Sequence, residues 1–142
     1  MCNAFMIAAS LAFVLTASAS GSIVAISLGN VTVDGSLPDS IRDAFDDDDG
    51  RPLKSASVDL DGDGIAEKFV PNEFLCGNGG CPWAIYSLTQ KRVIGTVFGS
   101  TLVVESSSIG GYKILNVSFS LGADRVVTEK YAFIDVYYRK TT

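Results

Sequence analysis

The sequence predicts an α+β fold, in which one short N-terminal helix packs on a twisted antiparallel sheet of about six strands. Two observations lead to this prediction. Apolar residues recur at helical spacing in one short stretch, residues 37–45, whereas from residue 56 onward short apolar runs alternate with polar or glycine-rich breaks. Most of these breaks span only a few residues. Connections of that length join antiparallel hairpins, because a parallel crossover requires a dozen or more residues.

Residues 1–19 have the features of a signal peptide. The segment Ala4–Ala17 is apolar and close in length to a signal-peptide core. The run Ala17-Ser18-Ala19 fits the small-x-small cleavage pattern, so we expect cleavage after Ala19. Residues 1–3 lack Lys and Arg, which departs from the usual pattern and leaves the translation start open. The alternative, a membrane anchor, would need about 20 apolar residues. We therefore predict a periplasmic or secreted protein with no membrane span after cleavage.

Residues 20–35 are predicted as a lead-in with one strand at most, and residues 36–142 as a single domain. Ser36 is a typical helix N-cap, and Pro38 fits the first turn of a helix. The apolar stripe that follows predicts a helix over residues 37–45.

Four aspartates, Asp46–Asp49, come directly after this helix. Negative charge opposes the dipole at a helix C-terminus, so the helix should end here. Such a run is usually solvated. A second cation site is the alternative.

The rest of the chain is predicted as β structure. The expected strands, in chain order, are 56–60, 68–70, 83–88, 93–98, 101–105, 112–121, 126–133 and 136–140. Trp83 is expected in the core. The aromatic residues near the C-terminus are expected to cover the sheet, and the alternative is an exposed row that binds glycan. These residues are Tyr131, Phe133, Tyr137 and Tyr138.

Residues 59–67 are the one stretch whose spacing indicates specific chemistry. Three aspartates stand at alternate positions, and Gly64 stands where a calcium loop turns sharply. Calcium takes six to eight oxygen ligands. The predicted ligands are Asp59, Asp61, Asp63, the backbone carbonyl of Ile65, and Glu67. The twelfth position is Val70 rather than Glu, so the stretch is not a complete EF-hand.

This spacing resembles the strand-loop-strand calcium loops of FG-GAP repeats in integrin alpha chains, where the fifth ligand comes at the ninth position. The alternative is an acidic turn that holds no calcium. In such a turn four carboxylates would repel one another. We therefore predict Ca²⁺ as the bound ion.

Cys76 and Cys81 remain after the leader, with Cys2, is removed. An even pair in an exported protein indicates a disulfide, and the four residues between them include three glycines that let the chain fold back. A redox pair usually has the C-x-x-C spacing, and a zinc site would need more ligands.

The composition excludes several classes of function. The chain has no histidine, which excludes Ser-His-Asp and Cys-His catalysis. Its net charge of −5 disfavours a nucleic-acid partner. Residues 34–73 carry 12 acidic and 4 basic side chains, whereas residues 74–142 carry 4 acidic and 7 basic. The first half is therefore the part expected to attract cations.

The run from Asp59 to Tyr86 resembles a group of uncharacterised bacterial exported proteins and lipoproteins. These share a D-x-D/N-G-D-G-x-x-E loop followed by a C-G-x-G-G-C loop. The closing run 131–137 is similar to their final hairpin, except that Val136 stands where a glycine is expected. The resemblance implies a periplasmic or secreted location and supports the disulfide. It implies no reaction.

Three classes of function stay open. The first, which we expect, is an exported non-enzymatic binding module, with a calcium-stabilised loop, a disulfide-closed glycine-rich loop, and an unknown protein or glycan partner. The second is an inhibitor of an extracellular hydrolase such as lysozyme, since a rigid loop loses little entropy on entering a cleft. The third is a carboxylate-based hydrolase that uses a pair such as Asp61 and Glu67, and substitution of Glu105 or Asp135 would test it.

Overall fold

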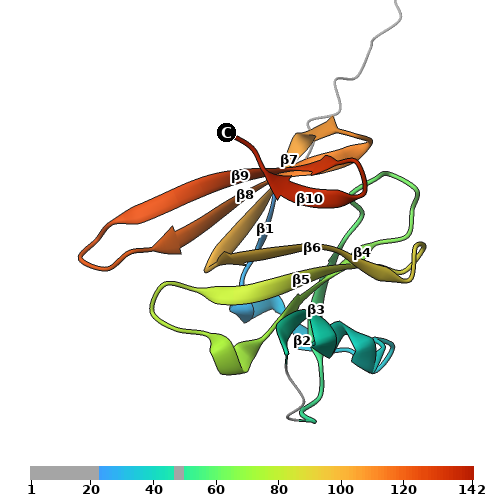
Figure 1. The fold of residues 1–142 in the computed structure, drawn as a ribbon, viewed down its shortest axis with the longest axis horizontal. Coiled ribbons are helices and arrows are strands. Elements are labelled where there is room, and N and C mark those ends of the chain that lie inside the picture. Colours follow the sequence, from blue (N-terminus) through green and yellow to red (C-terminus); the bar gives the residue numbers. More distant parts are fainter. Residues whose placement is uncertain (1–22, 47–49) are drawn as a thin grey trace, which may run out of the picture.

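The computed structural model describes residues 23–46 and 50–142. The predicted signal peptide and most of the Asp46–Asp49 run lie outside these residues. The described part is mostly β, with 54% strand and 11% helix, and it forms two antiparallel sheets of five strands each (Figure 1). The predicted α+β fold is therefore wrong, because no substantial helix packs on a sheet. No helix within these residues is long and apolar enough to cross a membrane.

One sheet consists of β2–β6, which pair in the order of the chain. Its strands are β2 (Thr32–Val33), β3 (Lys54–Val58), β4 (Glu67–Pro71), β5 (Cys81–Ser87) and β6 (Arg92–Gly99). The predicted hairpin around the acidic loop is confirmed, since β3 and β4 are antiparallel neighbours with Ala56 opposite Phe69.

The other sheet has the order β1-β7-β8-β9-β10. Its strands are β1 (Val24–Ile26), β7 (Thr101–Ile109), β8 (Tyr112–Ser120), β9 (Val126–Ile134) and β10 (Tyr137–Lys140). Strands β7 to β10 are successive hairpins, and β1 adds to the edge of β7 with Ile26 opposite Leu102. Residues 20–35, for which one strand was expected at most, supply two, β1 to this sheet and β2 to the other.

The chain crosses between the sheets at the end of β6, where only Ser100 separates β6 from β7. Gly99 makes this crossing sterically feasible. A Cβ at Gly99 would lie 2.5 Å from Cγ1 of Val117 and 2.8 Å from the carbonyl oxygen of Ser118. The Ser100 N–H donates to that same carbonyl at 2.8 Å. The crossing divides what the sequence predicted as one sheet into two layers.

The main core lies between the two sheets, which Figure 1 shows one above the other. Phe69 of β4 and Trp83 of β5 point into it, whereas Val70 and Ala84, the next residues of the same strands, belong to a second apolar cluster on the opposite face. Both faces of β4 and β5 are therefore covered. This explains why β5 is apolar almost throughout instead of alternating.

The second cluster is covered by η2 (Asp39–Phe45), a 3₁₀ helix, through Ile41 and the preceding Leu37. The predicted apolar stripe is present, but the helix is not α-helical and is too small to form a layer. It begins after Pro38 and is not capped by Ser36, whose N–H and hydroxyl bond to the Asp34 carboxylate instead. Two further 3₁₀ turns are η1 (Leu28–Asn30) and η3 (Glu73–Leu75).

The aromatic residues near the C-terminus do not form an exposed row. Phe133 and Tyr138 are buried in the core, and the Tyr138 hydroxyl donates to the carbonyl of Lys113 at 2.7 Å. Trp83 is fully buried as predicted, with its Nε1–H donated to the carbonyl of Gly99 at 2.9 Å. Because two of the four aromatic side chains are buried, the structure does not support a glycan-binding row at this place.

Candidate functional site

The acidic loop joins β3 to β4 and is fixed to both sheets. Val58 and Glu67, which flank the loop, lie opposite each other in the hairpin. From β8 of the other sheet, the Lys113 N–H donates to the carbonyl of Leu60 at 2.8 Å, and the Lys113 ammonium group to the carbonyl of Asp59 at 3.1 Å. Leu60 itself is buried in the main core. The loop therefore has a defined position relative to both layers.

Aspartate side chains shape the loop by accepting hydrogen bonds from its backbone. The two carboxylate oxygens of Asp59 accept from the N–H groups of Gly62 at 2.8 Å and Gly64 at 3.0 Å. Both glycines have a positive φ, 77° and 87°. Asp61 accepts from the Asp63 N–H at 3.1 Å. Such bonds let a short chain turn repeatedly, and they explain the alternation of Asp and Gly.

Three of the predicted ligands converge. Asp59, Asp61 and Glu67 each offer a carboxylate oxygen, and these oxygens lie within 4.8 Å of one another. Calcium–oxygen distances of about 2.3–2.6 Å place ligand oxygens at most roughly 5 Å apart across the ion. The three carboxylates therefore fit around one calcium ion without a change of fold.

The other two predicted ligands, Asp63 and Ile65, are not part of this group of three carboxylates. The Asp63 carboxylate accepts from the Ile65 N–H at 2.7 Å and from the Thr89 hydroxyl at 3.1 Å, and it lies outside the converging trio. Ile65, predicted to bind the ion through its backbone carbonyl, lies in the loop with its side chain exposed.

Glu67 is the unusual member of the trio, because its side chain is buried, with 1% exposed. One carboxylate oxygen accepts from the Leu60 N–H at 2.8 Å. Burial raises the pKa of Glu67 to about 7, the Leu60 N–H opposes this shift, and the charges of Asp61 and Asp63 add to it. A cation bound among the carboxylates would favour the charged form of Glu67.

The environment acts differently on Asp59. Burial disfavours its charge, but the hydrogen bonds from Gly64 and Gly62 outweigh that effect and lower its pKa. Around the loop, burial together with the charges of Asp61 and Glu67 raises the pKa of Tyr112 and Tyr138. The loop is thus a centre of negative potential.

The glycine-rich loop lies at the other end of β4. Its cysteines, Cys76 and Cys81, form the predicted disulfide, with sulfur atoms 2.09 Å apart and Cα atoms 4.1 Å apart. Gly80 has a φ of 143°, and a Cβ there would lie 2.4 Å from the backbone of Gly99. The Gly79 carbonyl accepts from the Ser120 N–H at 3.0 Å. The loop is therefore fastened to the crossing point between the sheets.

The two loops are close in sequence but distant in the fold. Pairing of Lys68 with Tyr86 and of Pro71 with Trp83 puts the acidic loop and the disulfide loop at opposite ends of the β4–β5 hairpin. Five residues of strand span roughly 16 Å. They are therefore separate sites.

Sequence reasoning missed the residues that the second sheet brings to the acidic loop, above all Lys113. It lies 54 positions from Asp59 and carries no local motif, so nothing in the sequence pointed to it. The suggested second cation site is only partly described. Asp46 ends η2 in the left-handed conformation, and Asp47–Asp49 lie outside the described residues.

Comparison of the chain with models of protein families, with curated proteins and with solved structures found no match. The resemblance to exported proteins with paired acidic and disulfide loops stays a prediction.

Proposed function

We propose that this protein is an exported, non-enzymatic binding module whose acidic loop is stabilised by a bound calcium ion. The observation that carries the proposal is the convergence of three carboxylates, one of them the buried Glu67. A buried carboxylate beside two others is unfavourable unless a positive charge or a proton compensates. Calcium supplies that charge, and oxygen atoms are its preferred ligands.

The effect of the ion would extend beyond the loop. Asp59 and Leu60 contact Lys113 in the other sheet, so a cation that holds Asp59 and Glu67 also holds the hairpin against β8. Calcium would then stabilise the packing of the two sheets against each other. This supports a structural role for the ion, with the partner bound elsewhere on the surface.

The two alternative functions have less support. A hydrolase that uses Glu67 as its acid would need substrate to reach a side chain that is buried against Leu60. Glu105 accepts hydrogen bonds from Ser107 and Asn116 and forms an ion pair with Lys130. The two hydrogen bonds are the main reason why its pKa is lowered. A carboxylate with a lowered pKa is suited to a structural role rather than to general acid catalysis.

An inhibitor loop should project from the surface in order to enter a cleft. In the disulfide loop Gly77 and Asn78 are exposed, whereas Gly80 is buried against Gly99 and the Gly79 carbonyl is bound to β8. That arrangement offers a short, recessed surface. We therefore do not propose inhibition of an extracellular hydrolase.

The test is thermal unfolding of the mature, oxidised protein in calcium and in chelator. We expect a higher melting temperature in calcium, because an ion that binds only the folded state adds about 2.7 kcal/mol at 100 times its dissociation constant. The variant Asp59→Asn, in which one ligand charge is lost, should respond much less. Asp124→Asn is the matched control, since Asp124 is exposed and its φ of 60° suits Asn. Equal melting temperatures with and without calcium in the wild type would show that the loop is an ordinary acidic turn.

A further inference from the structure

The disulfide loop contains a tight turn whose two central residues are Asn78 and Gly79. The Gly77 N–H donates to the Gly80 carbonyl at 2.9 Å, and the Gly80 N–H donates to the Gly77 carbonyl at 3.1 Å. Asn78 is exposed at the tip of this turn. Neither its side-chain amide nor the Gly79 N–H forms a hydrogen bond with another described residue. The hydrogen bonds that close the turn therefore leave both groups available for reaction.

An amide side chain and the backbone nitrogen that follows it can react with each other. A bond forms between the Gly79 nitrogen and Cγ of Asn78, and the bond from Cγ to Nδ2 breaks. Nδ2 leaves as ammonia and carries away the proton of the Gly79 nitrogen. The product is a cyclic imide, and water opens it at either carbonyl to give aspartate or isoaspartate. The reaction requires a side chain that is free to rotate and a nitrogen that is not crowded by a side chain of its own residue.

The fold itself requires glycine after Asn78. A Cβ at Gly79 would lie 2.8 Å from the carbonyl oxygen of Ser120 and 3.6 Å from a ring carbon of Phe98. The Gly79 carbonyl also accepts from the Ser120 N–H at 3.0 Å, which holds the turn against β8. The packing of the turn on β8 thus places beside Asn78 the residue that least hinders attack by its own nitrogen.

Asn30 provides a comparison within the same chain, because it is exposed as well. Its Oδ1 accepts from the Ser27 N–H at 2.8 Å, and its Nδ2 donates to the Ala25 carbonyl at 2.9 Å. Both bonds must break before the amide can turn toward the next residue. That residue is Val31, whose branched Cβ crowds its backbone nitrogen. We therefore expect Asn30 to be unreactive despite its exposure.

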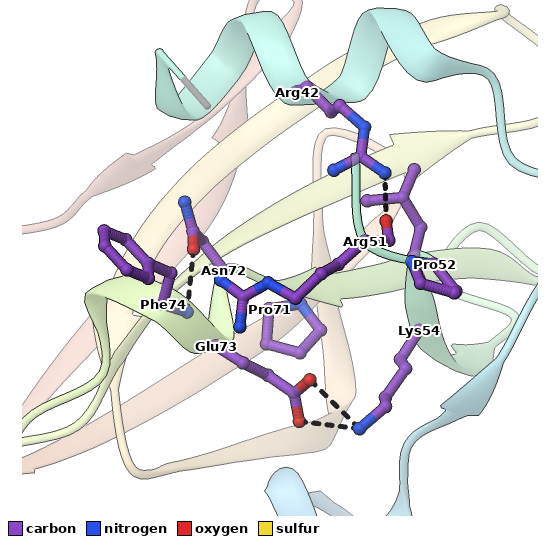
Figure 2. Close-up of a pocket in the computed structure, with 9 residues that line it drawn as sticks. Arg42, Arg51, Pro52, Lys54, Pro71, Asn72, Glu73 and Phe74 are labelled. Carbon is purple, nitrogen blue, oxygen red and sulfur yellow. Dashed lines mark hydrogen bonds and ion pairs between the residues drawn. The ribbon is translucent and has the colours of Figure 1, made fainter. Parts of the chain in front are cut away.

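The two remaining asparagines of the described residues are held more firmly. Only 4% of Asn72 is exposed, and its Oδ1 accepts from the Phe74 N–H at 3.0 Å (Figure 2). The Asn116 amide donates to the Glu105 carboxylate at 2.5 Å, and the residue that follows is Val117. Among the described asparagines, only Asn78 combines exposure, an amide without hydrogen bonds and a following glycine.

We infer that Asn78 is a site of spontaneous deamidation, which proceeds through a cyclic imide with Gly79. Each event puts a carboxylate into a loop, residues 76–81, whose sequence has no charged side chain. The isoaspartate product also lengthens the main chain of the ring that the Cys76–Cys81 disulfide closes. The inference goes beyond the proposed function, since it involves neither calcium nor a partner.

The test is incubation of the folded, oxidised protein at several values of mildly alkaline pH. After reduction and digestion, mass spectrometry measures conversion of amide to acid in the peptides that contain Asn78 and Asn30. We expect Asn78 to react at least about tenfold faster than Asn30, since the need to break one hydrogen bond slows a reaction by about that factor. Both aspartate and isoaspartate should form. The rate should rise with pH, because the attacking nitrogen must lose its proton.

Two variants of Asn78 check the residue, with ion-exchange chromatography of the intact protein as the readout. Asn78→Gln keeps an exposed amide but would have to form a larger, less favourable ring, so the acidic species should no longer appear. Asn78→Asp marks where the aspartate product elutes. The matched control is Asn30→Gln, in which the acidic species should form at the wild-type rate.

Other results would overturn the inference. Equal conversion at Asn78 and Asn30 would exclude a special reactivity of the turn. Aspartate without isoaspartate, or a rate independent of pH, would exclude the cyclic imide. An Asn78 that reacts in the urea-unfolded protein but stays intact in the folded protein would show that the fold protects the turn. None of these results bears on calcium binding, so the proposed function is tested separately.

Discussion

Substitution of Glu67 by Gln tests the central argument about the acidic loop. Gln has the same shape, and its amide oxygen can still accept from the Leu60 N–H, which Glu67 accepts at 2.8 Å. The change therefore removes the buried charge and leaves the packing almost unaltered. In the absence of calcium we expect the variant to be more stable than the wild type at high pH.

The sign follows from the pKa. Burial raises the pKa of Glu67 from the ordinary 4.5 to about 7. The folded state therefore binds the Glu67 proton more tightly than the unfolded state does, and this stability is fully present below pH 4.5 and lost as the pH rises through 7. A pKa of about 7 in the folded state against 4.5 in the unfolded state corresponds to about 3–4 kcal/mol when the pH is well above 7. Asp34 and Asp59 have lowered pKa values, so the stability that they contribute is lost only as the pH falls through those folded-state values, which lie below the usual range for Asp. Between pH 5 and 8 both aspartates therefore stay charged, and the pH dependence of stability in this interval reports on Glu67.

The assay is urea denaturation in chelator at intervals between pH 5 and 8.5. The free energy of unfolding of the wild type should fall across this range by up to about 3 kcal/mol, and that of Glu67→Gln should change much less. In saturating calcium the order should reverse, because the variant loses a charged ligand. A wild type whose stability rises from pH 5.5 to 8 in chelator, or a variant that follows the same curve, would refute the reasoning about Glu67.

Three further predictions concern the scaffold. Replacing both Cys76 and Cys81 by Ser should lower the free energy of unfolding by about 2 kcal/mol, the chain-entropy value for so small a ring, and reduction of the wild type should give the same loss in urea denaturation. Gly99→Ala should cost about 1–3 kcal/mol, because a Cβ would lie 2.5 Å from a β8 side chain, whereas Gly35→Ala, with nothing within 4 Å, should be nearly neutral by thermal unfolding. Trp83→Phe removes the Nε1–H that donates to the Gly99 carbonyl at 2.9 Å and part of a fully buried ring, so we expect a loss of about 2 kcal/mol in urea denaturation. A loss smaller than about 0.5 kcal/mol would contradict this role of Trp83.

Local features of the chain were predictable. The strands and most hairpins follow from alternation and short breaks, as in residues 112–121, where β8 (Tyr112–Ser120) is found. The convergence of Asp59, Asp61 and Glu67 follows from their spacing in a turning loop between two paired strands. The disulfide follows from a short glycine-rich connection. In each case the deciding residues lie within about ten positions of one another, so the sequence pattern contains them.

The division into two sheets was not predictable in this way. Short connections exclude parallel crossovers, but they do not determine whether two consecutive strands pair in the same sheet. Strands β6 and β7 are joined by a single residue and belong to different sheets. Where the chain passes from one sheet to the other, Gly99 lies close to Val117, a contact between residues that are distant in sequence. The apolar run 81–86 was a missed signal, since a strand buried on both faces implies a layer on each side.

The sequence by itself thus determined the strands, the disulfide, and a loop that gathers carboxylates, because these depend on neighbours along the chain. Only the tertiary structure decided that the strands form two layers and that Lys113 meets the acidic loop. These depend on contacts between residues far apart in sequence, where burial and charge come from other strands.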